Sequence, residues 1–68
     1  MVIGKNIKKL RQQNNMTQQQ LADKICVTRP FITAIENDKK SPTVQNLVNI
    51  ADVLGCTLDD LVKKKSAV

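Results

Sequence analysis

The chain has 68 residues, a formal net charge of +5 and one aromatic side chain, Phe31. A chain this short forms one small domain, whose core must be built from isoleucine, leucine, valine and alanine. Without histidine or a Cys-x-x-Cys pair, a zinc site is not expected, and no nucleophile–base pair points to an enzyme. We expect the two cysteines, Cys26 and Cys56, to be free thiols.

No apolar stretch approaches the roughly 20 residues that span a membrane, and the N-terminus lacks the apolar run of a secretory signal. We therefore expect a cytoplasmic protein. Residues 1–22 carry four basic side chains and no acidic one, whereas residues 41–62 carry three acidic side chains and no basic one. This distribution suits a protein that presents one face to a polyanion, although charge alone fits a merely soluble surface about as well.

The first helix is predicted for residues 3–13. Ile3, Ile7 and Leu10 are spaced i, i+4 and i+7, which gives one apolar stripe along that helix. The pair Asn14–Asn15 is expected to end the helix, because asparagine tolerates the left-handed conformation of a helix stop.

Two further short helices, joined by a tight turn, are predicted for residues 17–25 and 29–36. Apolar residues share one face within each helix: Leu21 with Ile25, and Ile32 with Ile35. Thr17 and Thr28 each precede a helix, where a hydroxyl can accept from a free backbone N–H. Pro30 falls in the first turn of its helix, where a missing N–H is not needed. The pattern is that of a helix-turn-helix.

A polar loop covers residues 37–42, and Thr43 can cap a fourth helix of about residues 44–54. The predicted core face of that helix consists of Leu47, Ile50, Ala51 and Leu54. Val44 is expected beside this face. Gly55 stands where a left-handed helix stop is wanted. Thr57 can cap a short fifth helix, whose apolar side contains Leu58, Leu61 and Val62.

Several residues with fixed spacing carry a resemblance to a known family: Thr17–Gln18, Leu21–Ala22, Val27–Thr28, Ile32, Ile35–Glu36–Asn37 and Ser41–Pro42. The chain resembles the Cro/phage-repressor (Xre-like) DNA-binding domains from Ile3 to Leu61. The resemblance implies an all-α, compact five-helix fold in one helix-turn-helix domain, residues 1–68. We expect an ordered core of about residues 3–62 and a frayed tail, residues 63–68.

One position departs from the family pattern. Cys26 stands in the turn where the family usually has glycine. A left-handed conformation costs a residue other than glycine roughly 1 kcal/mol or more. We therefore expect a turn that is slightly strained or reshaped.

The second helix of the motif has a predicted outer face. Since Ile32 and Ile35 point to the core, four residues point away at about 100° per residue: Pro30, Thr33, Ala34 and Asn37. Arg29, Phe31 and Glu36 lie on the flanks. Arg29 could donate two hydrogen bonds to a guanine, Pro30 and Ala34 could pack on thymine methyl groups, and Thr33 could do either. Phe31 could equally cover the edge of the core or face a base methyl group.

The resemblance assigns roles to these positions. Base readout in the family comes from the positions of Arg29, Pro30 and Ala34, with Thr33 close by. Gln18 matches a position that bonds to a phosphate and braces the recognition helix. Further expected contacts to the DNA backbone are Thr28, Asn37, Lys39 and Lys40. Arg11 and Glu36 match a salt bridge between the first and third helices, although a solvated pair is the alternative.

We expect a sequence-specific regulator of transcription that binds double-stranded DNA, most simply a repressor on a palindromic operator. It would act as a homodimer, because one motif of this size reads only a few base pairs. Leu58, Val62 and Val53 are the expected dimer contacts, unless Leu58 completes the core instead. No cofactor, metal, membrane or small-molecule ligand is expected. The alternative function is an antitoxin that neutralises a toxin; RNA binding is disfavoured because stacking aromatic residues are missing.

Overall fold

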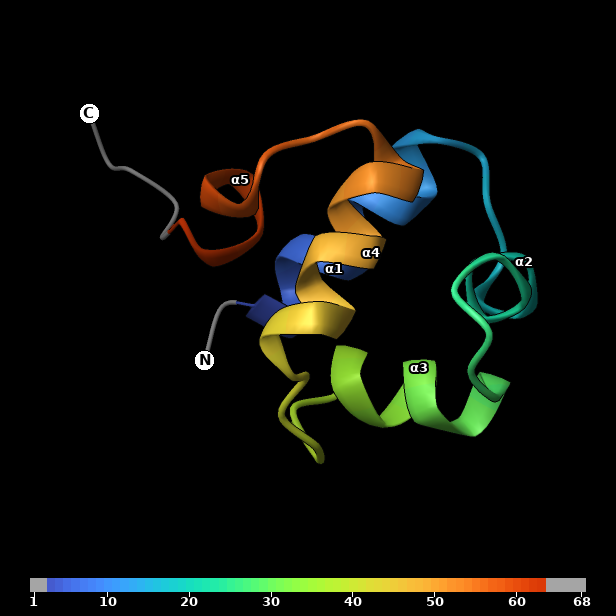
Figure 1. The fold of residues 1–68 in the computed structure, drawn as a ribbon. Helices are drawn as coiled ribbons and strands as arrows, with labels where there is room; N and C mark the ends of the chain where they lie inside the picture. The colour runs from blue at the N-terminus through green and yellow to red at the C-terminus, as the bar shows by residue number, and fades with distance from the viewer. Residues whose placement is uncertain (1–2, 64–68) are drawn as a thin grey trace.

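The computed structural model describes residues 3–63, which form five α-helices around one core (Figure 1). The helices are α1 (Ile3–Gln13), α2 (Gln18–Lys24), α3 (Arg29–Glu36), α4 (Val44–Leu54) and α5 (Leu58–Val62). The predicted all-α, five-helix fold is confirmed. Helix α2 ends one residue before the predicted end, and Ile25 is its C-cap. The frayed tail is predicted for residues 63–68, and residues 64–68 lie outside the described part of the chain.

Threonine caps the N-terminus of four of the helices. In each case the hydroxyl oxygen accepts a hydrogen bond from the backbone N–H three residues later: Thr17 from Gln20, Thr28 from Phe31, Thr43 from Asn46 and Thr57 from Asp60. Such a cap typically contributes about 1 kcal/mol. The Asp60 carboxylate in turn accepts from the N–H of Thr57, and this bond lowers the pKa of Asp60. The helix starts therefore follow from local sequence.

Left-handed residues follow α1 and α4, as the sequence predicts. Asn15 has a φ of 55° after α1, and Gly55 has a φ of 67° after α4. Cys26 adopts a φ of 60° in the turn between α2 and α3, which is the left-handed region that favours glycine. Within the turn, the backbone N–H of Val27 donates to the carbonyl oxygen of Ala22 at 2.9 Å.

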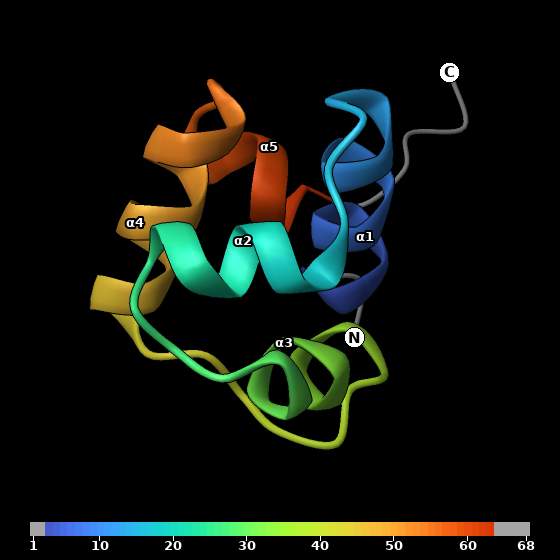
Figure 2. The same ribbon diagram turned by 90° about the vertical axis from the view of Figure 1, so that its right-hand side faces the viewer.

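The core lies between all five helices. Its fully buried side chains are Ile7, Leu21, Ile32, Ile35, Ile50 and Leu61. Ala22 is also fully buried, and Figure 2 shows α3 end-on where α2 passes across it. A small buried side chain on α2 allows close approach of neighbouring helices. Cys56 is half-buried, and this burial, with a smaller effect from Asp60, raises the pKa of its thiol.

The prediction for Val44 is wrong, because its side chain is 73% exposed rather than packed beside the core. The buried residues of α4 are Ile50, Ala51 and Leu54, all in its C-terminal half. The first turn of the helix therefore lies outside the core, although the spacing of its apolar residues continues to Val44. Spacing gives the direction of a side chain, whereas tertiary packing decides how far the core reaches.

Gly4 allows α1 to lie directly against the C-terminal end of α3. A Cβ atom at this position would lie 2.5 Å from the carbonyl oxygen of Ile35 and 2.7 Å from that of Glu36. Both atoms belong to the backbone and cannot swing away. A glycine inside a helix destabilises it by roughly 1 kcal/mol relative to alanine. Here the close approach of the two helices explains why glycine occupies the position.

Asn6 joins α1 to the end of α5. Its side-chain amide donates to the carbonyl oxygens of Leu61, at 2.8 Å, and Lys63, at 2.9 Å. These carbonyls belong to the last turn of α5 and to its C-cap residue, where intrahelical partners are missing. Asn6 therefore fixes the C-terminal end of the shortest helix onto the first. Within residues 3–63, no helix is long and apolar enough to cross a membrane.

Candidate nucleic-acid interface

Helix α3 lies at one end of the molecule, and no other helix covers its outer side (Figures 1 and 2). Ile32 and Ile35 are buried on its inner side. The residues that the sequence places on the outer face are exposed or half-buried: Arg29, Pro30 and Asn37 are exposed, and Thr33 and Ala34 are half-buried. The structure thus places the predicted base-reading residues together on one accessible face.

Arg11 and Glu36 form a bidentate ion pair between α1 and α3. Arg11 Nε donates to Glu36 Oε2 at 2.7 Å, and Nη2 donates to Oε1 at 3.1 Å. The remaining terminal nitrogen, Nη1, donates to the carbonyl oxygen of Met16 at 2.7 Å. The two residues are only 7% and 5% exposed, so Glu36 lies in the interior and not on a solvated flank. Removing one partner of such a pair typically costs about 3–5 kcal/mol, because it leaves a buried charge.

Gln18 extends this ion pair to the outer face of α3. Its Nε2 donates to Glu36 Oε1 at 3.0 Å, and its Oε1 accepts from the Thr33 hydroxyl at 2.8 Å. Gln18 therefore bridges α2 to α3 at two points one turn apart. Its amide nitrogen carries two hydrogens, and the bond to Glu36 uses one of them. Bracing of α3 by Gln18 and a contact of Gln18 to a phosphate are thus compatible.

The buried polar side-chain atoms of this region all have hydrogen-bond partners. Among residues 3–63, no buried side-chain nitrogen or oxygen lacks a partner. We call the four connected residues Arg11, Glu36, Gln18 and Thr33 the bracing network. The sequence predicted its ion pair through the resemblance, whereas the Gln18–Thr33 bond has no sequence signal of its own, because the two residues are far apart in the chain.

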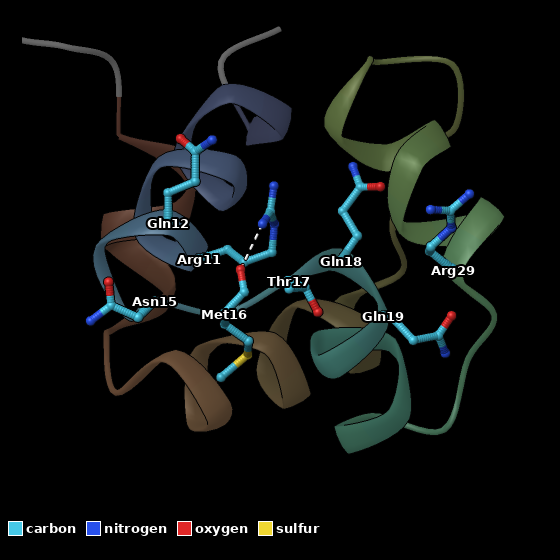
Figure 3. Close-up of a pocket in the computed structure, with 8 residues that line it drawn as sticks. All are labelled: Arg11, Gln12, Asn15, Met16, Thr17, Gln18, Gln19 and Arg29. Atoms are coloured by element: carbon cyan, nitrogen blue, oxygen red, sulfur yellow. Dashed lines mark hydrogen bonds between the residues drawn. The ribbon is translucent and has the colours of Figure 1, made fainter.

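An open hollow of about 400 Å³ lies beside the bracing network. It is lined by residues from the end of α1, the start of α2 and the start of α3: Arg11, Gln12, Asn15, Met16, Thr17, Gln18, Gln19 and Arg29. In Figure 3, Gln18 lies between Arg11 and Arg29. Seven of the eight lining residues have polar or charged side chains, among them the exposed Arg29, so the hollow offers hydrogen-bond donors to an anionic chain.

Phe31 packs partly against the core, at the edge of α3. Lys40 lies over its ring, with Nζ 5.2 Å from the ring centroid, which is within reach of a cation–π interaction. Of the two alternatives for Phe31, the structure shows the contact with the core. The contact with the ring also places Lys40 beside α3.

The remaining residues that the sequence predicts to contact the DNA backbone flank α3. Thr28 is exposed, and its hydroxyl oxygen accepts from the Phe31 N–H at 3.3 Å, which leaves its hydroxyl hydrogen available. Asn37 and Lys39 are exposed at the other end of the helix. The N–H of Lys39 donates to the Ala34 carbonyl oxygen at 2.8 Å, so the loop starts in a fixed conformation.

Helix α5, which contains two of the three predicted dimer contacts, lies away from α3 (Figure 1). Leu58 is 41% exposed and Val62 is 44% exposed, whereas Leu61 between them is fully buried. It is therefore Leu61, and not Leu58, that completes the core. Val53 on α4 is half-buried and packs against the core.

Comparison with known proteins agrees with this geometry. The sequence model of a helix-turn-helix family matches residues 7–61. The uncharacterized HTH-type transcriptional regulator YqaE of Bacillus subtilis is 42% identical over 65 residues, which cover 96% of this chain and 56% of that protein. The immunity repressor protein of Bacillus phage phi105 is 31% identical over 68 residues, 100% of this chain and 47% of that protein. The chain thus spans about half the length of these two relatives.

A solved structure has the same fold. The P22 c2 repressor protein in complex with a synthetic operator superposes with a TM-score of 0.87 at 25% sequence identity. The superposition covers 96% of this chain and 98% of the other. Together with the family match and the phage relative, this likeness identifies the chain as a member of the helix-turn-helix family of the Cro and phage-repressor type.

Proposed function

We propose that this chain is a transcriptional repressor that recognises a specific sequence of double-stranded DNA through the outer face of α3. The observation that carries the proposal is that face itself. Its accessible residues are backed by the bracing network, so the helix is held rigidly at the surface. The likeness to a repressor seen on its operator supports the same mode of binding.

Base readout would come from the first turns of α3. Arg29 is exposed and can present its guanidinium to O6 and N7 of a guanine in the major groove. Pro30 and Ala34 have apolar surfaces that can contact thymine methyl groups. Because these side chains are short or flat, the helix axis can lie close to the base edges.

Contacts to the DNA backbone would hold α3 in register. Gln18 and Thr28 lie before or at the start of the helix, and Asn37, Lys39 and Lys40 follow it, so the contacts flank the reading face. These contacts would supply affinity without sequence preference. The two lysines would also make the affinity for DNA fall as the salt concentration rises. The acidic residues of 41–62 would then lie on the side remote from the phosphates.

The operator would be palindromic and bound by a homodimer in the cytoplasm. Two copies related by a two-fold axis would place two α3 helices about one helical turn of DNA apart, roughly 34 Å. Leu58 and Val62 are apolar and exposed at the end away from α3, so they can join two copies without covering the reading face. Val53 would extend the contact onto α4.

Selection of bound duplexes from a random DNA pool tests the proposal. We expect enrichment of an inverted repeat whose half-sites have centres 10–11 base pairs apart, roughly one helical turn. Binding with no enriched sequence, at an affinity set only by salt, would refute sequence-specific recognition. Enrichment of a single unrepeated half-site would refute the dimer and leave recognition by α3 standing.

A further inference from the structure

We propose that the Thr33 hydroxyl acts only as a hydrogen-bond acceptor toward DNA, and therefore selects a base that offers an exocyclic amino group, adenine or cytosine. This inference rests on the proposed function, since it requires α3 to lie in the major groove. It goes further, because it assigns a chemical class of base to one position. The direction of each bond in the bracing network leads to it.

The polarity of the network is set at Glu36. Its carboxylate accepts from Arg11 at both oxygens, with Nε 2.7 Å from Oε2 and Nη2 3.1 Å from Oε1. Paired in this way with a guanidinium, the carboxylate is ionised and has no hydrogen to donate. Any further group within hydrogen-bond distance of Glu36 must therefore be a donor.

That group is the side-chain amide of Gln18. One end of the amide lies 3.0 Å from Glu36 Oε1 and the other lies 2.8 Å from Thr33 Oγ1. If the amide were turned around, its carbonyl oxygen would face the carboxylate, and two acceptors would repel each other in a part-buried place. The nitrogen must point to Glu36, and consequently the carbonyl oxygen of Gln18 points to Thr33.

Within the protein, the Thr33 hydroxyl can act only as a hydrogen-bond donor. It donates to Gln18 Oε1 at 2.8 Å, and the only other partner that residues 3–63 place within reach, the Arg29 carbonyl oxygen at 3.2 Å, is also an acceptor. A hydroxyl has one hydrogen, so both arrangements use that hydrogen inside the protein. Toward the groove, Thr33 then presents lone pairs alone.

The major groove distinguishes the bases by this property. Adenine presents the N6 amino group and cytosine the N4 amino group, whereas guanine O6 and thymine O4 are acceptors. Opposite Thr33, either amino group completes a hydrogen bond, while guanine or thymine would place two acceptors face to face. The ion pair with Arg11, on the far side of Glu36, thereby determines which bases Thr33 tolerates.

The test compares wild type with Thr33→Val and Thr33→Ser in selection from a random duplex pool. Valine has the shape of threonine without the hydroxyl, and serine keeps the hydroxyl without the methyl group. We expect one position of the wild-type site to prefer adenine or cytosine, by about fivefold for one hydrogen bond. The preference should persist with serine and disappear with valine, while other positions stay unchanged.

A second measurement isolates the amino group. In the best duplex, the base at that position is replaced by the analogue that lacks the amino group, purine for adenine or 2-pyrimidinone for cytosine. Affinity should fall about fivefold for wild type and little for Thr33→Val, because the substitution has already removed the partner. Since this comparison is made within each protein, any effect of valine on the Gln18 bond cancels.

The outcomes separate the inference from the proposed function. A preference for guanine or thymine that depends on the hydroxyl would overturn the inference and leave recognition by α3 intact. So would valine and wild type selecting identical sites, or equal losses on removal of the amino group. Failure of wild type to enrich any sequence would overturn the proposed function, and this inference with it.

Discussion

Arg29 is the exposed residue that should discriminate most strongly between sequences. Replacing it with alanine removes the two hydrogen bonds that a guanidinium can make to one guanine. We expect a loss of about 1–3 kcal/mol on the best site and a relaxed preference at one base pair. Titration of duplexes that carry each base at that position measures both effects.

Lys39→Ala is the matched control for Arg29. It removes the same charge from the far end of α3, where a contact to a phosphate is expected, so all duplexes should lose affinity by a similar factor. The dependence of affinity on salt should also become shallower by about one ion. If both variants weaken all sequences uniformly, α3 does not read bases through Arg29.

Glu36 is linked through Gln18 to Thr33 on the outer face of α3, and its charge should matter for folding. Glu36→Gln leaves the Arg11 guanidinium buried without its counter-charge. We expect a loss of about 3 kcal/mol in the free energy of unfolding, against less than about 0.5 kcal/mol for the exposed control Asp52→Asn. Urea unfolding measures both, and equal midpoints for the two variants would show that the pair contributes nothing beyond a surface acid.

At the scale of single elements, the turn of the helix-turn-helix holds a conformation that suits its residue poorly. Cys26 is exposed and has a φ of 60°. Cys26→Gly relieves the clash of Cβ in the left-handed region, partly offset by greater freedom of the unfolded chain. We expect the glycine variant to be more stable by about 0.5–1 kcal/mol, which raises the melting temperature by several degrees.

Cys26→Ala separates backbone strain from loss of the thiol. Alanine keeps the Cβ atom, so its melting temperature should stay at the wild-type value. If alanine stabilises as much as glycine, the effect comes from the sulfur and its surroundings and not from φ. Equal melting of all three proteins would show that the turn stores no measurable strain.

The sequence predicts elements well where their chemistry is local. Thr17, Thr28 and Thr43 cap helices as expected, and Asn15 takes the left-handed conformation that ends α1, because each interaction spans only a few residues. The outer face of α3 also follows from periodicity, since Ile32 and Ile35 fix its inner side.

Contacts between distant segments escape sequence reasoning. Nothing local marks Asn6 as a partner for the end of α5, or Gly4 as the point where α1 meets the backbone of α3. The depth of Glu36 likewise depends on how Arg11 crosses from another helix. For Val44, the spacing predicts a contact beside the core that the structure does not have, because the core ends before this residue. Each miss concerns the relative position of two helices, which a periodic pattern does not contain.

At the scale of the whole molecule, the two proposed interfaces lie at separate ends. Helices α3 and α5 lie apart in Figure 1, with α1 and α4 between them. Asn6 anchors α5 to α1, and the bracing network anchors α3 to α1 and α2. The first helix therefore sets the distance between the reading face and the proposed dimer contact. A rigid spacing of this kind is what two half-sites at a fixed separation require.

Val62→Lys should separate the dimer and keep the fold. Val62 is 44% exposed, so a lysine can reach solvent in the single copy, whereas burying two ammonium groups across a two-fold axis is costly. Sedimentation over a range of concentrations should show association of wild type and a monomer for the variant, with unchanged helical circular dichroism. Affinity for a palindromic duplex should fall far more than affinity for a single half-site, because only the palindrome uses both copies.

Val44→Lys is the matched control for the dimer, since Val44 is an apolar residue, 73% exposed, in the first turn of α4 and not part of the α5 contact. It introduces the same charge and should associate like wild type. Loss of association in both variants would indicate general charge repulsion and not a contact through α5. A wild-type monomer at every concentration, bound one-to-one to a palindromic duplex, would contradict the homodimer outright.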